Sequence, residues 1–298
     1  MSVNLPNHYI EKYQNNLRLS LQRYGSVFRP CCEVNSYEGN GARAIDFFDP
    51  IEMDQVTTRF APMPRTDAGL DAVWVYPEDY RVAQMVDSFD KLRVMTDPKS
   101  KLVESATRSA GRKIDDVVRT AFFGTMQTGV RGQSTEQFST ANHRVAVTVG
   151  NGGSGNVNMN AEKIKAGLEI MLNANVDVQR EEIYLAVSPS GWRALLDDDE
   201  FINEDFKTGT INGVTMMRFL NTVNIMVYND LENTADPYRR SVMWCKSGMH
   251  LGFWRDITSR VDERPDIDGV PYQLYTTLTL GATRTEAGKV VDILCNEA

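Results

Sequence analysis

The sequence predicts an α+β fold, in which one long helix is followed by a body of mixed helices and strands. The long helix is indicated by residues 97–124, where apolar positions recur with helical spacing. The short strand-like runs that follow are not separated by regular crossover helices, which argues against a doubly wound sheet. Of the 298 residues, 42% are hydrophobic and 24% are charged, as in an ordinary folded protein.

The long helix is expected over residues 98–123. Asp97 can accept hydrogen bonds from the first free N–H groups, and Pro98 suits the first helical position. Gly124 is expected to end the helix in the left-handed conformation. The charged side chains, including Asp115 and Asp116, are expected to lie on the faces away from the packed stripe. That stripe, the expected packing face of the helix, consists of Leu102, Ala106, Ala110, Ile114 and Val118.

The chain before this helix contains an amphipathic segment and a candidate hairpin. Residues 8–24 carry an apolar stripe with helical spacing, which can pack on its own domain or on another molecule. Residues 44–48 and 73–76 read as strands, and the long connection between them is of a kind that is usually functional. We expect a projecting hairpin that leans on a neighbouring molecule, because an isolated hairpin is only marginally stable.

The chain after the long helix alternates irregularly between strands and helices. A second amphipathic helix follows Asn160, and Ser188 and Pro189 begin a short helix that runs to Leu196. The expected strands are 143–149, 183–187, 214–217, 223–228, 243–245, 249–254, 272–280 and 290–294.

Charge and cysteine content exclude several classes of protein. The 32 basic and 40 acidic residues give a net charge of −8, so an overall basic footprint for nucleic acid is missing. The four cysteines form no C-x-x-C spacing, which favours buried free thiols in a reducing compartment. The sequence has neither a secretory-signal pattern nor a run of 18 apolar residues, so we expect a soluble intracellular chain with no membrane partner.

The candidate chemical motifs favour ordinary loops over active sites. Gly150–Gly155 fits G-x-G-x-x-G, but a dinucleotide site needs a helix that begins at the glycines, and Asn156–Asn160 intervenes. A surface loop is therefore favoured. The acidic run Asp197–Glu200 lacks calcium-loop spacing and is expected to be solvated. We expect no catalytic residues, no cofactor, no metal site and no enzymatic activity.

Several motifs resemble a family of phage major capsid proteins. They are Asp87–Leu92 (DSFDKL), Thr96–Pro98 (TDP) and Gly111–Asp116 (GRKIDD), together with Gly281–Arg284 (GATR) and Val290–Ile293 (VVDI). The order of amphipathic terminus, long hairpin, long helix and mixed body is similar to that of tailed-bacteriophage major capsid proteins with the Hong Kong 97-type fold. The resemblance covers most of residues 40–298.

This resemblance implies four segments and an assembly function. The segments are an N-terminal arm (1–34), an E-loop hairpin (35–86), a peripheral domain with the spine helix (87–159 and 241–298) and an axial domain (160–240). Copies would assemble as pentamers and hexamers into an icosahedral shell enclosing packaged double-stranded DNA. The alternatives are an encapsulin-like compartment, a soluble nucleotide-dependent oxidoreductase that uses the glycine loop, and an adhesive or tail structural protein.

The resemblance also implies partners and interface positions. The chain would partner itself, enclose DNA without sequence-specific binding, and assemble in the host cytoplasm into the virion capsid; scaffold, portal and decoration proteins are candidate partners. No lysine lies between Lys12 and Lys91, so a shell crosslinked through an E-loop lysine is not expected. The expected interface residues are Tyr13, Leu17, Leu21, Phe47, Phe48, Arg59, Arg65, Trp74 and Tyr76.

Overall fold

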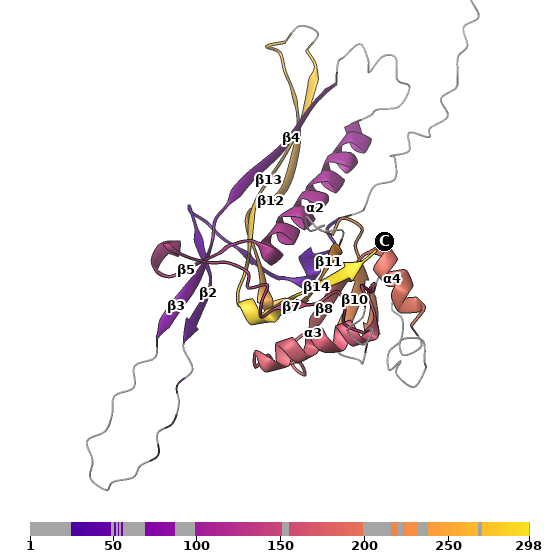
Figure 1. The fold of residues 1–298 in the computed structure, drawn as a ribbon. Coiled ribbons are helices and arrows are strands. Elements are labelled where there is room, and N and C mark those ends of the chain that lie inside the picture. The colour runs from indigo at the N-terminus through magenta and orange to yellow at the C-terminus, as the bar shows by residue number, and fades with distance from the viewer. Residues whose placement is uncertain are drawn as a thin grey trace, which may run out of the picture. The chain divides into compact units, whose positions relative to one another are not determined.

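The computed structural model describes residues 25–48, 51, 53, 55, 69–86, 99–150, 155–198, 216–219, 223–231, 238–267 and 270–297. These residues form two compact units. The smaller unit consists of the described parts of Met1–Ser26, Asp79–Lys113 and Arg255–Leu278, and the larger unit of those of Val27–Glu78, Ile114–Trp254 and Thr279–Ala298. The helix α2 (Lys99–Phe123) and the paired strands β12 (Met249–Glu263) and β13 (Tyr272–Arg284) contribute to both (Figure 1).

A six-stranded mixed sheet forms the core of the larger unit. Its order is β7-β14-β11-β8-β10-β9. β10 runs parallel to β8 and β7 parallel to β14, while the other neighbours are antiparallel. All residues of the central strand β8 are buried, as expected of a continuous apolar run. The strand bounds are Arg144–Val145 (β7), Ile183–Val187 (β8), Met216–Phe219 (β9), Val223–Val227 (β10), Tyr238–Cys245 (β11) and Val290–Asn296 (β14).

Two predicted helices accompany this sheet, and local capping explains where they begin. α3 (Ala161–Asn173) starts after Asn160, whose side chain accepts a hydrogen bond from the backbone N–H of Lys163 at 2.8 Å. α4 (Pro189–Leu196) starts after Ser188, whose hydroxyl oxygen accepts from Gly191 at 2.9 Å. Apolar side chains of both helices join the core cluster of the sheet, so the predicted helices are confirmed.

The predicted hairpin is present in the larger unit. β2 (Ala42–Phe48) and β3 (Leu70–Val75) pair antiparallel. The hairpin continues into β5 (Met126–Thr128) and β6 (Ser134–Glu136), which gives the antiparallel order β2-β3-β5-β6. Its small core contains Ala42, Ala44, Val73, Val75 and Met126. β5 and β6 were not predicted, because three residues are too few to show a period.

The third sheet has the order β1-β12-β13-β4. β1 (Glu33–Ser36) is parallel to β12, and β4 (Glu78–Val86) lies at the other edge. Neither edge strand was predicted. At the ends of β12 and β13 the backbone N–H of Arg264 donates to the carbonyl oxygen of Pro271 at 2.9 Å. Short 3-10 turns occupy Arg29–Cys31, Val130–Gly132, Lys246–Gly248 and Ala287–Lys289.

The long helix α2 begins at Lys99 among the described residues, close to its predicted start. Of the predicted stripe, Ala106, Ala110, Ile114 and Val118 are buried and Leu102 is half-buried. Two expectations are wrong. Asp115 is fully buried instead of facing solvent. Gly124 does not have a positive φ, since the chain leaves the helix directly into the extended strand β5.

Candidate assembly surfaces

The segment that precedes β1 is fixed to α2 by a buried carboxylate. Asp115 Oδ1 accepts hydrogen bonds from the backbone N–H groups of Val27 (3.0 Å) and Phe28 (3.1 Å). Hydrogen bonds to a charged acceptor are stronger than neutral ones, particularly out of water. This carboxylate therefore holds the chain in place within the last part of the expected arm (1–34).

Phe28 is itself part of the core of the larger unit. Its ring centroid lies 4.6 Å from that of Tyr228, 5.6 Å from that of Phe122 and 5.7 Å from that of Trp244. The indole N–H of Trp244 donates to the carbonyl oxygen of Cys31 at 2.9 Å. Residues 27–31, which the resemblance places in the N-terminal arm, are thus packed within the body.

The open end of the β2–β3 hairpin exposes apolar side chains. Phe48 and Leu70 are paired across the two strands, and 74% of Phe48 and 63% of Leu70 is exposed. Ile51 and Met53, just beyond β2, are also exposed. Phe47 is partly buried against the core of this sheet. Apolar side chains that gather at one exposed end mark a surface suited to contact with another molecule.

The base of the hairpin is held by a tight loop of the same chain. The indole N–H of Trp74 donates to the carbonyl oxygen of Gly129 at 2.8 Å. The hydroxyl of Tyr76 donates to the carbonyl oxygen of Arg131 at 2.9 Å. The polar ends of these two expected interface residues are thus occupied within the chain, and only 38% of Tyr76 is exposed. The other expected interface residues, Tyr13, Leu17, Leu21, Arg59 and Arg65, lie outside the described residues.

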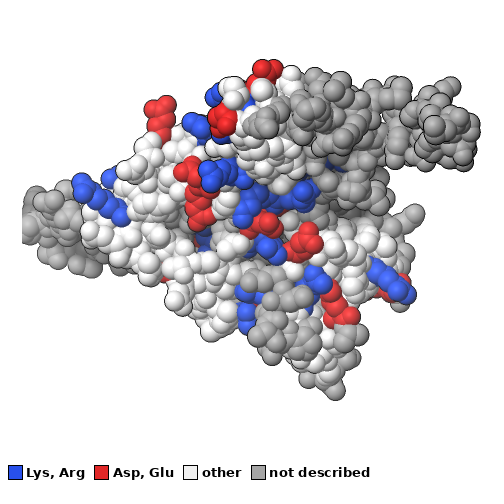
Figure 2. Space-filling model, turned by 90° about the horizontal axis from the view of Figure 1, so that it is seen from above, with Lys and Arg blue, Asp and Glu red and all other residues white. Residues whose placement is uncertain are grey.

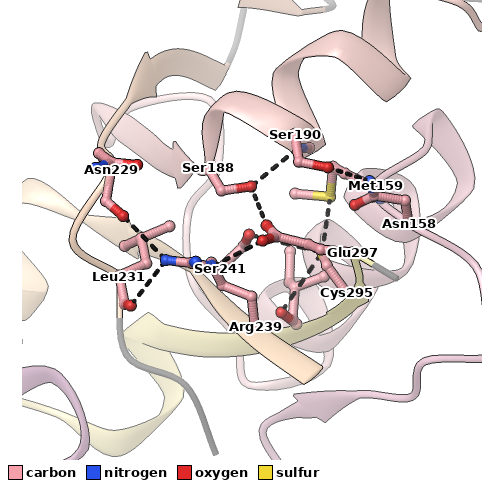
Figure 3. A network of polar contacts seen from close by, with 12 residues as sticks. Asn158, Met159, Ser188, Ser190, Asn229, Leu231, Arg239, Ser241, Cys295 and Glu297 are labelled. Carbon is pink, nitrogen blue, oxygen red and sulfur yellow. Dashed lines mark hydrogen bonds and ion pairs between the residues drawn. The ribbon is translucent and has the colours of Figure 1, made fainter. Parts of the chain in front are cut away.

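A polar network joins the end of β14 to the rest of the larger unit (Figure 3). The carboxylate of Glu297 accepts a hydrogen bond from the Ser188 hydroxyl and pairs with Arg239 Nε at 2.9 Å. Arg239 also donates to the carbonyl oxygens of Asn229 (2.9 Å) and Leu231 (3.3 Å). One carboxylate therefore connects the last described residues to the start of α4 and to the chain after β10.

Asp292 provides a fully buried carboxylate within the six-stranded sheet. Asp292 lies on β14, and its Oδ2 accepts from Arg144 Nε at 2.7 Å and from an Arg240 N–H at 2.9 Å. The guanidinium of Arg240 also lies 3.5 Å from the ring centroid of Phe123. The sequence shows no spacing that links these residues, because they come from four separate elements.

Two buried cations serve the structure. Lys163 Nζ donates to the carbonyl oxygens of Val157 and Leu294, each at 2.7 Å, and burial lowers the pKa of its ammonium group. Arg284 donates to the carbonyl oxygen of Phe122 at 2.8 Å, and burial lowers the pKa of its guanidinium to about 10. All four cysteines are free and buried, as predicted.

The glycine loop is not placed as a dinucleotide site requires. Gly150 packs against the side chain of Asn160, whose amide donates to the carbonyl oxygen of Val149 at 3.1 Å, but α3 begins only at Ala161, so the glycines do not themselves open the helix. Residues 151–154 lie outside the described part of the chain. Among the residues that the structure describes, no group of three or more His, Cys, Asp or Glu side chains could hold a metal ion. No described helix is long and apolar enough to cross a membrane.

Basic and acidic side chains are interspersed on the face shown in Figure 2. On α2, Arg108 pairs with Glu104 at 2.6 Å and Arg119 pairs with Asp116 at 3.4 Å. Pairs near the protein surface contribute little to stability, about 0–1 kcal/mol each. Their opposite charges nevertheless keep the potential along α2 from having a single sign. This face therefore offers mixed charge instead of a uniformly basic track.

Residues 5–297 match the sequence family described as phage capsid protein. Solved capsid structures share the fold at low identity. The capsid asymmetric unit of cyanophage Pam1 is 15% identical with a TM-score of 0.71, and 96% of each chain is covered. The capsid of Ralstonia phage GP4 is 10% identical with a TM-score of 0.72, and 99% of this chain and 98% of that chain are covered. No curated protein sequence matches the chain.

The family match covers nearly the whole chain and includes α2, the β2–β3 hairpin and all three sheets. The structural matches likewise span nearly the full length of both chains. The predicted resemblance and fold are thereby confirmed, and the comparisons support the capsid prediction over the oxidoreductase alternative. The chain belongs to the phage capsid protein family, as a structural major capsid protein with the Hong Kong 97-type fold.

Proposed function

We propose that copies of this chain assemble as pentamers and hexamers into an icosahedral shell that encloses packaged double-stranded DNA. Membership of the phage capsid protein family supports the shell. The observation that carries the mode of assembly is the exposed apolar end of the β2–β3 hairpin, at Phe48 and Leu70. On this proposal the end of the hairpin packs against a neighbouring copy.

The energetics of the hairpin support contact between copies. Complete burial of one large apolar side chain contributes about 1.5–3 kcal/mol. Phe48, Leu70, Ile51 and Met53 together can therefore stabilise a contact that one copy cannot make alone. Trp74 and Tyr76 hold the base of the hairpin within the chain, so the exposed pair Phe48 and Leu70 is presented by an already paired strand segment.

The charge distribution supports containment of DNA instead of tight binding to it. The net charge is −8, and the face in Figure 2 has mixed charge. Strong nonspecific binding would need many unopposed Lys and Arg contacts with phosphates. The chain would therefore enclose DNA without binding it tightly. On the same proposal it acts without catalysis and assembles in the host cytoplasm, with scaffold, portal and decoration proteins as candidate partners.

Electron microscopy of the purified full chain tests the hairpin contact. The wild-type chain, alone or with its scaffold, should form closed uniform shells, whereas Phe48→Lys/Leu70→Lys should remain as folded, unassembled protein. Leu172→Lys is the matched control, since Leu172 is 57% exposed but lies on α3. Normal shells from the double variant would contradict the role of the hairpin. Native particles filled with an enzyme cargo instead of DNA would contradict the proposed content.

A further inference from the structure

The smaller unit contains a cavity of about 270 Å³ between α2 and the strands β4 and β13. Apolar groups of Val82, Ala110 and Leu278 line it, together with the ring of Tyr80. The ammonium of Lys113, which also lines it, lies 4.5 Å from the centre of that ring. Sites for small molecules usually measure about 300–1,000 Å³. The size and lining suit a few apolar side chains better than a cofactor.

The chain passes close to this cavity as it leaves the N-terminal segment. The backbone of Gly25 lies directly on α2 at Gly111, where an added Cβ would be only 2.7 Å from the carbonyl carbon of Gly25. Gly111 follows Ala110, which lines the cavity. The chain is thus held beside the cavity at Gly25, with 24 residues preceding that point.

The conformation of Gly25 fits the end of a helix. Its φ is +71°, the left-handed conformation that commonly follows the last residue of a helix. The preceding segment, residues 8–24, has the apolar stripe of an amphipathic helix, and Leu17, Leu21 and Tyr24 are its members nearest to Gly25. Leu21 is four residues before Gly25, which is about 6 Å along a helix. A helix that ends at Gly25 would bring Leu21 and Tyr24 within reach of the cavity.

We propose that Leu21 and Tyr24 fill this cavity in their own chain, so that residues 8–24 pack along α2. Because the segment is tethered at Gly25, its effective concentration at the cavity is high. The same segment of a second copy lacks this tether and would have to compete through an intermolecular contact. This inference does not depend on pentamers, hexamers or DNA, and its test does not use particle formation as a readout.

Disulfide trapping in the full chain tests the contact. Leu21→Cys is combined with Ser109→Cys, because Ser109 lines the cavity. The matched control combines Leu21→Cys with Thr107→Cys, since Thr107 is exposed and two residues away, on the opposite face of the helix. The four native cysteines are buried, so the added thiols are the reactive ones. Mild oxidation should give an intrachain disulfide between residues 21 and 109, seen by peptide mass spectrometry, with little product from the control.

Two results of this experiment would overturn the proposal. A disulfide-linked dimer on a non-reducing gel would mean that another copy fills the cavity. Equal or absent product from the two pairs would mean that Leu21 does not face the cavity. As a second measurement without added thiols, Leu21→Ala/Tyr24→Ala should lower the Tm by several degrees, whereas Asn15→Ala/Gln22→Ala, on the opposite face of the predicted helix, should leave it unchanged. Equal Tm values for the two double variants would also overturn the proposal.

Discussion

The carboxylate of Asp115 accepts a hydrogen bond from the backbone N–H of Phe28 across 87 positions of the chain. The sequence around Asp115 resembles the charged face of an exposed helix, yet this side chain is fully buried. From this buried position on α2, Asp115 binds the segment that precedes β1. Loss of the carboxylate leaves two N–H groups, those of Val27 and Phe28, without this acceptor.

Replacing Asp115 should therefore destabilise the chain strongly. We expect Asp115→Ala to lower the free energy of unfolding by about 2–4 kcal/mol, because buried donors would lose a charged acceptor. Asp116→Ala is the matched control, since Asp116 is partly exposed and pairs with Arg119 on the helix surface. It should change the free energy by no more than about 1 kcal/mol. Urea unfolding measures both, and similar values would mean that the buried hydrogen bonds contribute nothing.

Gly111→Ala should destabilise the chain although alanine favours helices. In an exposed helix interior this change stabilises by about 1 kcal/mol. Here the new Cβ would lie 2.7 Å from the backbone of Gly25, so one of the two segments must move. Thr107→Ala on the exposed face of α2 is the control and should be neutral or slightly stabilising. A raised Tm for Gly111→Ala in thermal unfolding would show that the Gly25 contact is absent.

Two truncated chains should show that the core needs Phe28 to fold but does not need the residues before Gly25. A chain lacking residues 1–24 should fold, because it keeps Val27, Phe28 and the carbonyl of Cys31. A chain lacking residues 1–32 should be insoluble, because removal of a buried phenylalanine alone costs about 3–5 kcal/mol. Circular dichroism and size-exclusion chromatography distinguish the two. Cooperative unfolding of the shorter chain would contradict the role of Phe28.

Acid should weaken the fold through His250. Burial lowers the pKa of its imidazole to about 4 from an ordinary value near 6.5. Between these values the unfolded chain binds the extra proton and the folded chain does not, so stability falls as the pH falls from 6.5 toward 4. The expected slope is about 1.4 kcal/mol per pH unit.

His250→Gln isolates this contribution. The Tyr37 hydroxyl oxygen lies 2.8 Å from Nε2 of His250, and a glutamine amide can retain a hydrogen bond there. The difference in unfolding free energy between the wild type and this variant should shrink as the pH falls from 7 to 5. A difference that stays constant over this interval would exclude His250 as the source.

Assembled particles should release intact single chains on denaturation. With no lysine between Lys12 and Lys91, the hairpin cannot supply an amine for a covalent link between copies. In boiled, reduced particles this chain should run as one band near 33.6 kDa on a denaturing gel. A ladder of multiples that resists heat and reductant would contradict this expectation.

Features that depend on neighbouring residues could be predicted from the sequence. α2, α3 and α4 were recognised because helical spacing and the caps at Asn160 and Ser188 are local signals. The strand β8 was recognised because its five residues form an apolar run between turns. The resemblance to phage capsid proteins came from motifs flanking or within α2 and near the C-terminus, which are also contiguous.

Features that depend on distant pairing could not be predicted. β4 is recognisable as a strand only through its pairing with β13, and β1 only through β12. Asp292 gives no hint in the sequence that Arg144 and Arg240 converge on it. The hairpin was predicted as an interface, but the hydrogen bonds that occupy Trp74 and Tyr76 come from a loop more than 50 residues away.

The position of β14 has a consequence for the order of events in the cell. It follows β7, β8, β10 and β11 along the chain, yet it lies inside the six-stranded sheet between β7 and β11. The core of the larger unit therefore cannot close until β14 has been synthesised, and its closure requires long-range pairing, which is slow. A nascent chain that has not yet received β14 leaves the β11 edge of the sheet unpaired.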